Sequence, residues 1–157
     1  MRKFPQLHRS IAASALIICM LGAAPVQDVQ FSDVTQTVKI QFKQENSATS
    51  NKYLVETMGG GVALLDYDND GRLDIFFTNG AKIDDPMPDG KLPDKSDPKF
   101  SNRLYHQSSN GTFTDVTEKA GLTGIPQNHY DMGVAVGDYD NDGFEDMYVT
   151  GFGGNTL

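Results

Sequence analysis

The chain has 157 residues and carries 21 acidic against 13 basic side chains, a formal net charge of −8. This negative surface repels phosphate backbones and anionic lipids, so we expect no nucleic-acid partner and no electrostatic attachment to a membrane. The single cysteine, Cys19, excludes an intramolecular disulfide.

The first 24 residues predict a secretory signal peptide. A basic start at Arg2, Lys3 and Arg9 precedes an apolar run over 11–24 that ends in small residues. The run is short for a membrane span, so we expect none in the mature chain. Lipidation at Cys19 and an uncleaved anchor are the alternatives. The expected location is therefore secreted, periplasmic or on the cell surface.

Removal of residues 1–24 leaves ten basic against 21 acidic residues, a net charge of −11. The mature chain begins with a segment over 25–58 in which Phe31–Gln36 reads as a short strand. This strand resembles Phe113–Glu118 later in the chain, and we predict that it closes the ring of a repeat protein.

Two nine-residue stretches, 66–74 and 138–146, share one acidic pattern. Each has carboxylates at positions 1, 3, 5 and 9 and a glycine at position 6. Carboxylates so close together repel one another unless a cation lies among them, and an oxygen-only cage favours calcium. Position 12 lacks the Glu that an EF-hand requires, because it is Phe77 in one copy and Val149 in the other.

The predicted ligands of the two calcium ions are side-chain carboxylates plus one backbone carbonyl per loop. For the first ion they are Asp66, Asp68, Asp70, Asp74 and the carbonyl of Arg72; for the second they are Asp138, Asp140, Asp142, Asp146 and the carbonyl of Phe144. Acidic turns that bind nothing, and a catalytic calcium, are the alternatives.

Short apolar runs flank each loop and predict strands buried on both faces, at 61–65, 75–78, 133–136 and 147–150. Asn110-Gly111 suits a tight turn between two further strands. Each unit then holds four strands, with a first unit over 59–122 and the start of a second over 123–157. The insertion at 81–101, rich in proline, aspartate and lysine, is expected to be a solvated loop or a ligand-contacting one.

Four-stranded units of this period predict the blades of an all-β propeller. The 133 residues after position 24 are too few to close a ring, so we expect the sequence to be a piece of a longer protein.

The sequence resembles the FG-GAP/VCBS repeat family, and within it the N-terminal part of the cartilage acidic protein (ASPIC/UnbV) group. The resemblance rests on 56–63, both acidic loops, Asn102-Arg103-Leu104-Tyr105 and 111–117. It implies a partial propeller of calcium-loaded FG-GAP/VCBS blades in an exported protein that is not an enzyme.

The expected function is that of a non-catalytic adhesion-type module that binds a protein or a glycan. Two alternatives remain, the propeller part of a secreted polysaccharide lyase or hydrolase and a structural spacer at the cell surface. His106 and His129 are isolated in the sequence and pair with no nucleophile motif. Tyr67 and Tyr139 are expected to pack against a neighbouring blade, and Gly59-Gly60-Gly61 to permit close packing of the blades.

Overall fold

The computed structural model describes residues 28–124 and 128–157, so the predicted signal peptide lies outside the described residues. The chain forms two compact units, one ending at Ser32 and one spanning Asp33–Leu157. Every strand among the described residues belongs to the second unit, and each described residue of the first, 28–32, lies outside regular secondary structure. Within the described ranges there is no α-helix, which agrees with the predicted all-β class.

The first sheet is an antiparallel meander of four strands in the order β1-β2-β3-β4. The strands are β1 (Val62–Leu65), β2 (Asp74–Phe77), β3 (Arg103–Gln107) and β4 (Phe113–Asp115). The predicted tight turn joins β3 to β4, where Ser108 N–H donates to the Thr112 carbonyl at 2.8 Å and Gly111 has a φ of 79°. The four-stranded repeat unit is therefore confirmed for this part of the chain.

The second sheet has three antiparallel strands in the order β5-β6-β7. These are β5 (Tyr130–Gly137), β6 (Asp146–Phe152) and β7 (Gly154–Thr156). The pairing of β5 with β6 shifts register between Asp131 and Gly133. This irregularity lies near the start of β5, where the Asp131 side chain is buried.

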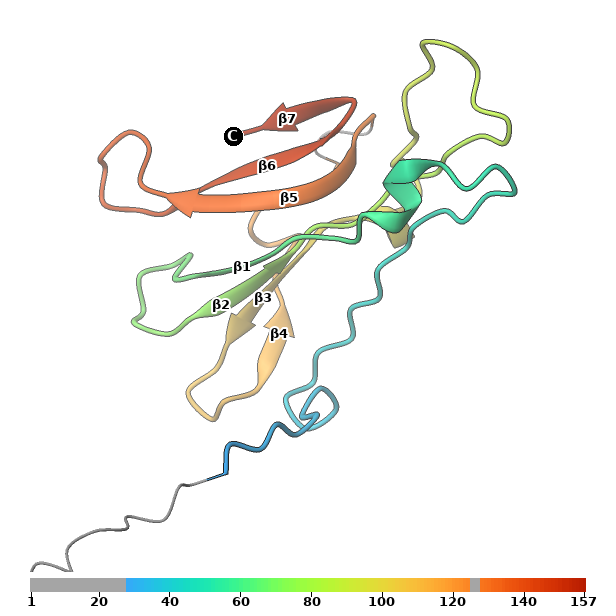
Figure 1. Cartoon of the computed structure of the whole chain (residues 1–157). Coiled ribbons are helices and arrows are strands. Elements are labelled where there is room, and N and C mark those ends of the chain that lie inside the picture. Colours follow the sequence, from blue (N-terminus) through green and yellow to red (C-terminus); the bar gives the residue numbers. More distant parts are fainter. Residues whose placement is uncertain (1–27, 125–127) are drawn as a thin grey trace, which may run out of the picture. The chain divides into compact units, whose positions relative to one another are not determined.

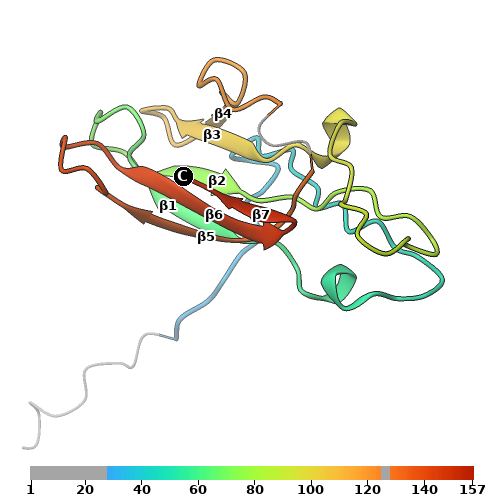
Figure 2. The same cartoon turned by 90° about the horizontal axis from the view of Figure 1, so that it is seen from above.

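The two sheets stack face to face and enclose the main core (Figures 1 and 2). Leu65, Phe76 and Leu104 come from the first sheet and are no more than 2% exposed, while Val149 comes from the second. The prediction that the flanking strands are buried on both faces is wrong for β5 and β6, where Ala135 and Tyr148 are exposed, and for β1. The residues of β1 alternate, with Val62 and Leu64 more than half exposed, because the core between the sheets takes only Ala63 and Leu65 of this strand.

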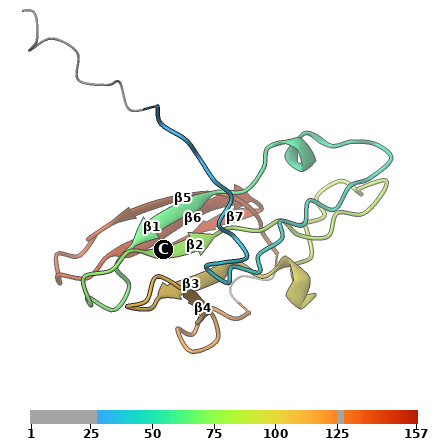
Figure 3. The same ribbon diagram turned by 90° about the horizontal axis from the view of Figure 1, so that it is seen from below.

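The segment before β1 does not contain the predicted strand at Phe31–Gln36. Residues 28–34 lack regular secondary structure and 35–39 form a turn, closed by Ile40 N–H donating to the Thr35 carbonyl at 3.1 Å. The chain then runs against the first sheet (Figure 3). Phe113 N–H donates to the Val38 carbonyl at 2.8 Å, and the Phe42 ring stacks on Phe77. A short 3₁₀ helix, η1 (Leu54–Thr57), precedes β1.

The insertion at 81–101 is not simply a solvated loop. Ala81, Ile83, Lys95 and Phe100 are buried, and Lys82 pairs with Asp94 in an isolated β-bridge. A second 3₁₀ helix, η2 (Pro98–Phe100), leads into β3. The charged composition suggested a solvated loop, but the apolar residues between the charges pack inward.

The glycine triplet before β1 permits close packing, as predicted. A Cβ on Gly60 would come 2.8 Å from the Thr78 carbonyl oxygen, and one on Gly61 would come 3.0 Å from the Met132 carbonyl oxygen. Only glycine allows β1 and β5 to approach so closely here.

Candidate metal centres

The first acidic loop joins β1 to β2 and wraps around one carboxylate. Asp66 Oδ1 accepts a hydrogen bond from Asp70 N–H at 2.9 Å, and its Oδ2 accepts one from Gly71 N–H at 2.8 Å. The backbone turns through two left-handed residues, Asn69 with a φ of 56° and Gly71 with a φ of 83°. Asparagine and glycine tolerate this conformation better than other residues do, which explains their places in the pattern.

The second loop, between β5 and β6, repeats this arrangement. Asp138 accepts from the N–H groups of Asp142 and Gly143 at 3.1 and 3.0 Å. Asn141 and Gly143 have φ values of 61° and 90°, close to those of their counterparts. Two loops 72 residues apart thus share one backbone conformation. We conclude that the shared pattern of acids, asparagine and glycine determines this conformation.

The carboxylates gather into groups that a single ion could bridge. Oxygens of Asp66, Asp68 and Asp70 lie within 4.8 Å of one another, and one oxygen from each of Asp138, Asp140 and Asp146 does the same. Two oxygens across a calcium ion are about 4.6–5.2 Å apart, twice the Ca–O distance. The residues present therefore fit a hard cation held by oxygen atoms. Like charges at this separation cost about 1–4 kcal/mol per pair, which a cation would offset.

Asp74, the ninth residue of the first loop, is completely buried. Its Oδ1 accepts from Gln107 N–H at 2.7 Å, and its Oδ2 accepts from Tyr67 N–H at 3.2 Å. The corresponding Asp146 is only partly buried and accepts from Tyr139 N–H at 2.8 Å. The two loops therefore close in the same way, but the first one is anchored more firmly to its sheet.

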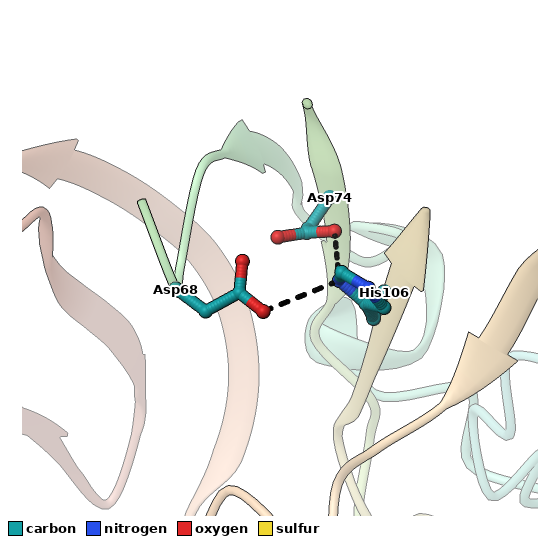
Figure 4. A group of neighbouring side chains, drawn as sticks. All are labelled: Asp68, Asp74 and His106. Carbon is teal, nitrogen blue, oxygen red and sulfur yellow. Dashed lines mark hydrogen bonds and ion pairs between the residues drawn. The ribbon is translucent and has the colours of Figure 1, made fainter. Parts of the chain in front are cut away.

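His106 reaches the first loop from β3, and sequence reasoning missed it (Figure 4). Its Nδ1 lies 3.1 Å from Asp74 Oδ1 and 3.7 Å from Asp68 Oδ2. With these two aspartates it forms a third group of possible metal-binding atoms. The pairing of Ile75 with Tyr105 places Asp74 beside His106 on the adjacent strand, so the register of β2 with β3 was the signal that could have found it.

Two predicted ligands have other contacts in this structure. Asp142 lies outside the group of Asp138, Asp140 and Asp146, and its Oδ1 accepts from Phe144 N–H at 2.9 Å. The side chain of Arg72 pairs with Asp70, and its Nε donates to the Gln107 carbonyl at 2.7 Å. The roles of the Arg72 and Phe144 carbonyls stay predictions.

The two loop tyrosines differ. Tyr67 packs against the core and meets the His106 ring edge-on, with 5.7 Å between the ring centroids. Burial, together with the charges of Asp68, Asp74 and Asp70, raises the pKa of the Tyr67 hydroxyl. Tyr139 is 77% exposed in the described structure, and its packing against a neighbouring blade stays a prediction.

The loops also contact one another. Asp66 N–H donates to Glu145 Oε2 at 2.8 Å, and Asn69 Nδ2 donates to the Gly143 carbonyl at 3.3 Å. Both loops lie at one end of the stacked sheets, as Figure 1 shows. The two candidate centres are therefore neighbours on a single acidic edge.

Elsewhere, a cavity of about 300 Å³ opens between Phe76, Leu122, Met147 and Val149, bordered by Asn102 and Asp131. Among the residues that the structure describes, no helix combines the length and hydropathy needed to cross a bilayer.

The meander and its acidic hairpin loops define a class of repeat protein in which each unit carries its own candidate cation loop. The FG-GAP-like repeat model matches residues 66–149, more than half of the chain, so the chain belongs to the FG-GAP-like repeat family. This family implies the blades of a propeller. Searches of curated proteins and of solved structures found no match.

Proposed function

We propose that this chain is an exported, calcium-dependent FG-GAP/VCBS propeller segment that binds a protein or glycan ligand and catalyses no reaction. Within the family we assign it to the ASPIC/UnbV group, on the motifs around 56–63, 102–105 and 111–117. The observation that carries the proposal is the repeated loop. Both copies have the same backbone conformation, and each copy brings three aspartates together.

Calcium would be held in the first loop by Asp66, Asp68, Asp70 and Asp74 with the Arg72 carbonyl. In the second loop Asp138, Asp140, Asp142 and Asp146 with the Phe144 carbonyl would hold it. The ion would supply the positive charge that these carboxylates lack, and it would fix the loops in one conformation. Extracellular calcium modules bind with dissociation constants of about 0.1–1 mM, which suits an exported protein.

The test is calorimetric unfolding of the chain in chelator and in 5 mM calcium. With constants of about 0.1–1 mM, each site should add about 1–2 kcal/mol to the free energy of unfolding. The double variant Asp70→Ala/Asp142→Ala should lose most of this gain. Asp89→Ala, which removes an exposed aspartate from the insertion, is the matched control and should keep it. A gain that survives the double substitution would contradict the ligand assignment.

Ligand binding is tested by screening the calcium-loaded chain against glycan and protein arrays. A calcium-dependent hit that chelator abolishes supports the binding role. Turnover of polysaccharide by the chain alone would contradict the non-catalytic role.

A further inference from the structure

The insertion carries a lysine whose surroundings are unlike those of the other lysines nearby. Lys95 is 7% exposed and lies eight residues before β3. Neighbouring Lys91 and Lys99 have side chains that are about half exposed and pair with Asp84 and Asp97 at the surface. A buried ammonium group is costly, so its partners define what it can do.

Three acceptors surround the amine. Lys95 Nζ lies 2.7 Å from Asp131 Oδ2, 2.9 Å from Asn102 Oδ1 and 2.6 Å from the Asn79 carbonyl oxygen. The lysine therefore meets a carboxylate from the second sheet and the carboxamide of the residue just before β3 in the same place.

The carboxylate and the carboxamide are also joined to each other. Asn102 Nδ2 donates to the same Asp131 Oδ2 at 2.8 Å, so one oxygen faces both the amine and the amide nitrogen. On the other side of the amide, Asn79 N–H donates to Asn102 Oδ1 at 2.8 Å. Asp131 is 1% exposed and Asn79 is 1% exposed, so bulk water is excluded from both.

We propose that Lys95 and Asn102 form an intramolecular isopeptide bond, with Asp131 as the proton shuttle. The Lys95 ammonium gives a proton to Asp131, and the neutral Nζ attacks Asn102 Cγ. Negative charge develops on Oδ1, where the Asn79 N–H stabilises it. Asp131 then returns its proton to Nδ2, the Cγ–Nδ2 bond breaks and ammonia leaves, which takes up the second proton of the original ammonium. The products are one Nζ–Cγ amide, one ammonium ion and the unchanged carboxylate.

The surroundings favour each part of this reaction. Burial lowers the pKa of the Lys95 amine, an effect that the charge of Asp131 only partly offsets, so the nucleophilic neutral form becomes more accessible. The fold holds the two reacting groups against each other, which replaces an encounter in solution. The cavity bordered by Asn102 and Asp131 gives ammonia a place to leave.

The repeat offers an internal comparison. Asn155 is the counterpart of Asn102 in the second unit, and its Oδ1 accepts from Gly151 N–H at 3.3 Å. Its hydrogen bonds in the described structure include none to a lysine, so among the described residues the three groups come together in the first unit alone. The bond would fasten the end of the insertion to the start of β3, beside the buried Asp131 of the second sheet.

The test is mass spectrometry of the full chain. The intact mass should be lower than the sequence mass by one ammonia for each chain. Trypsin should leave residues 92–99 covalently joined to 100–103, because an acylated Lys95 resists cleavage. The full sequence mass, with 92–95, 96–99 and 100–103 recovered as separate peptides, would overturn the proposal. A loss of water with Lys95 joined to Asp131 would overturn the assignment to Asn102.

Variants then assign the roles. Lys95→Arg should restore the unmodified mass, whereas Lys99→Arg, an exposed lysine four residues away, should keep the ammonia loss. Asp131→Asn should fold without forming the bond, and a folded, cross-linked Asp131→Asn would refute the proton shuttle. If that variant does not fold, Asp131→Glu keeps the carboxylate and should form the bond more slowly. In either case, the intact mass of the wild-type chain shows whether the isopeptide bond has formed.

Discussion

The ninth residue of each acidic loop offers a comparison of two equivalent carboxylates in different surroundings. Replacing Asp74 by alanine removes the acceptor of two backbone N–H groups, those of Tyr67 and Gln107, at a site that is fully buried. Each buried donor left without a partner costs about 1–3 kcal/mol. We therefore expect Asp74→Ala to lower the free energy of unfolding by about 2–6 kcal/mol.

Asp146→Ala is the matched variant, because this side chain is only partly buried and accepts from Tyr139 N–H. Its expected cost is about 1–3 kcal/mol, at the lower end because water reaches the freed donor. The measurement is urea unfolding followed by circular dichroism, with chelator present so that metal binding does not contribute. Equal costs for the two variants, or a larger cost for Asp146→Ala, would refute the reasoning.

Three further expectations can be checked by the same unfolding measurements. Leu104→Ala, at a position 1% exposed between the sheets, should cost about 2–5 kcal/mol, whereas Leu92→Ala, at a position 43% exposed, should change stability by about 0.5 kcal/mol or less. Gly143→Ala places a side chain at a φ of 90° and should cost about 1–2 kcal/mol, while Gly137→Ala, with open space and no positive φ, should cost less. Hydrogen bonds from Thr49 lower the pKa of Glu56, so its carboxylate stabilises the fold above about pH 4.3 and this contribution is lost as the pH falls further. The stability gap between wild type and Glu56→Gln should therefore be widest at neutral pH and narrow toward pH 3, with the exposed Glu118→Gln as the control; a gap that widens in acid would contradict this sign.

The sequence predicted the strands around the acidic loops because their apolar runs and their turn residues are local signals. Asn69 and Gly71 occupy the left-handed positions that their residue types favour, and Asn110-Gly111 forms the expected turn. These features depend on a few adjacent residues, so a single sequence is enough to find them.

The parts that were missed depend on distant segments. His106 joins the first loop only through the register of β2 with β3, and Lys95 is buried only because Asn102 and Asp131 supply its acceptors. The Phe31–Gln36 motif matched a strand elsewhere in sequence, but Phe113 of β4 donates to Val38 instead, beyond the predicted strand. Local similarity alone gave no information on these partners.

The contact between the two acidic loops makes the two copies of the loop non-equivalent. Position 8 is Leu73 in the first loop and Glu145 in the second, and only Glu145 can accept the amide proton of Asp66. An exchange of the two nonapeptides would therefore break this link even though both would keep their own carboxylates. The two loops share their candidate cation ligands, but only the second carries a side chain at position 8 that contacts the other loop.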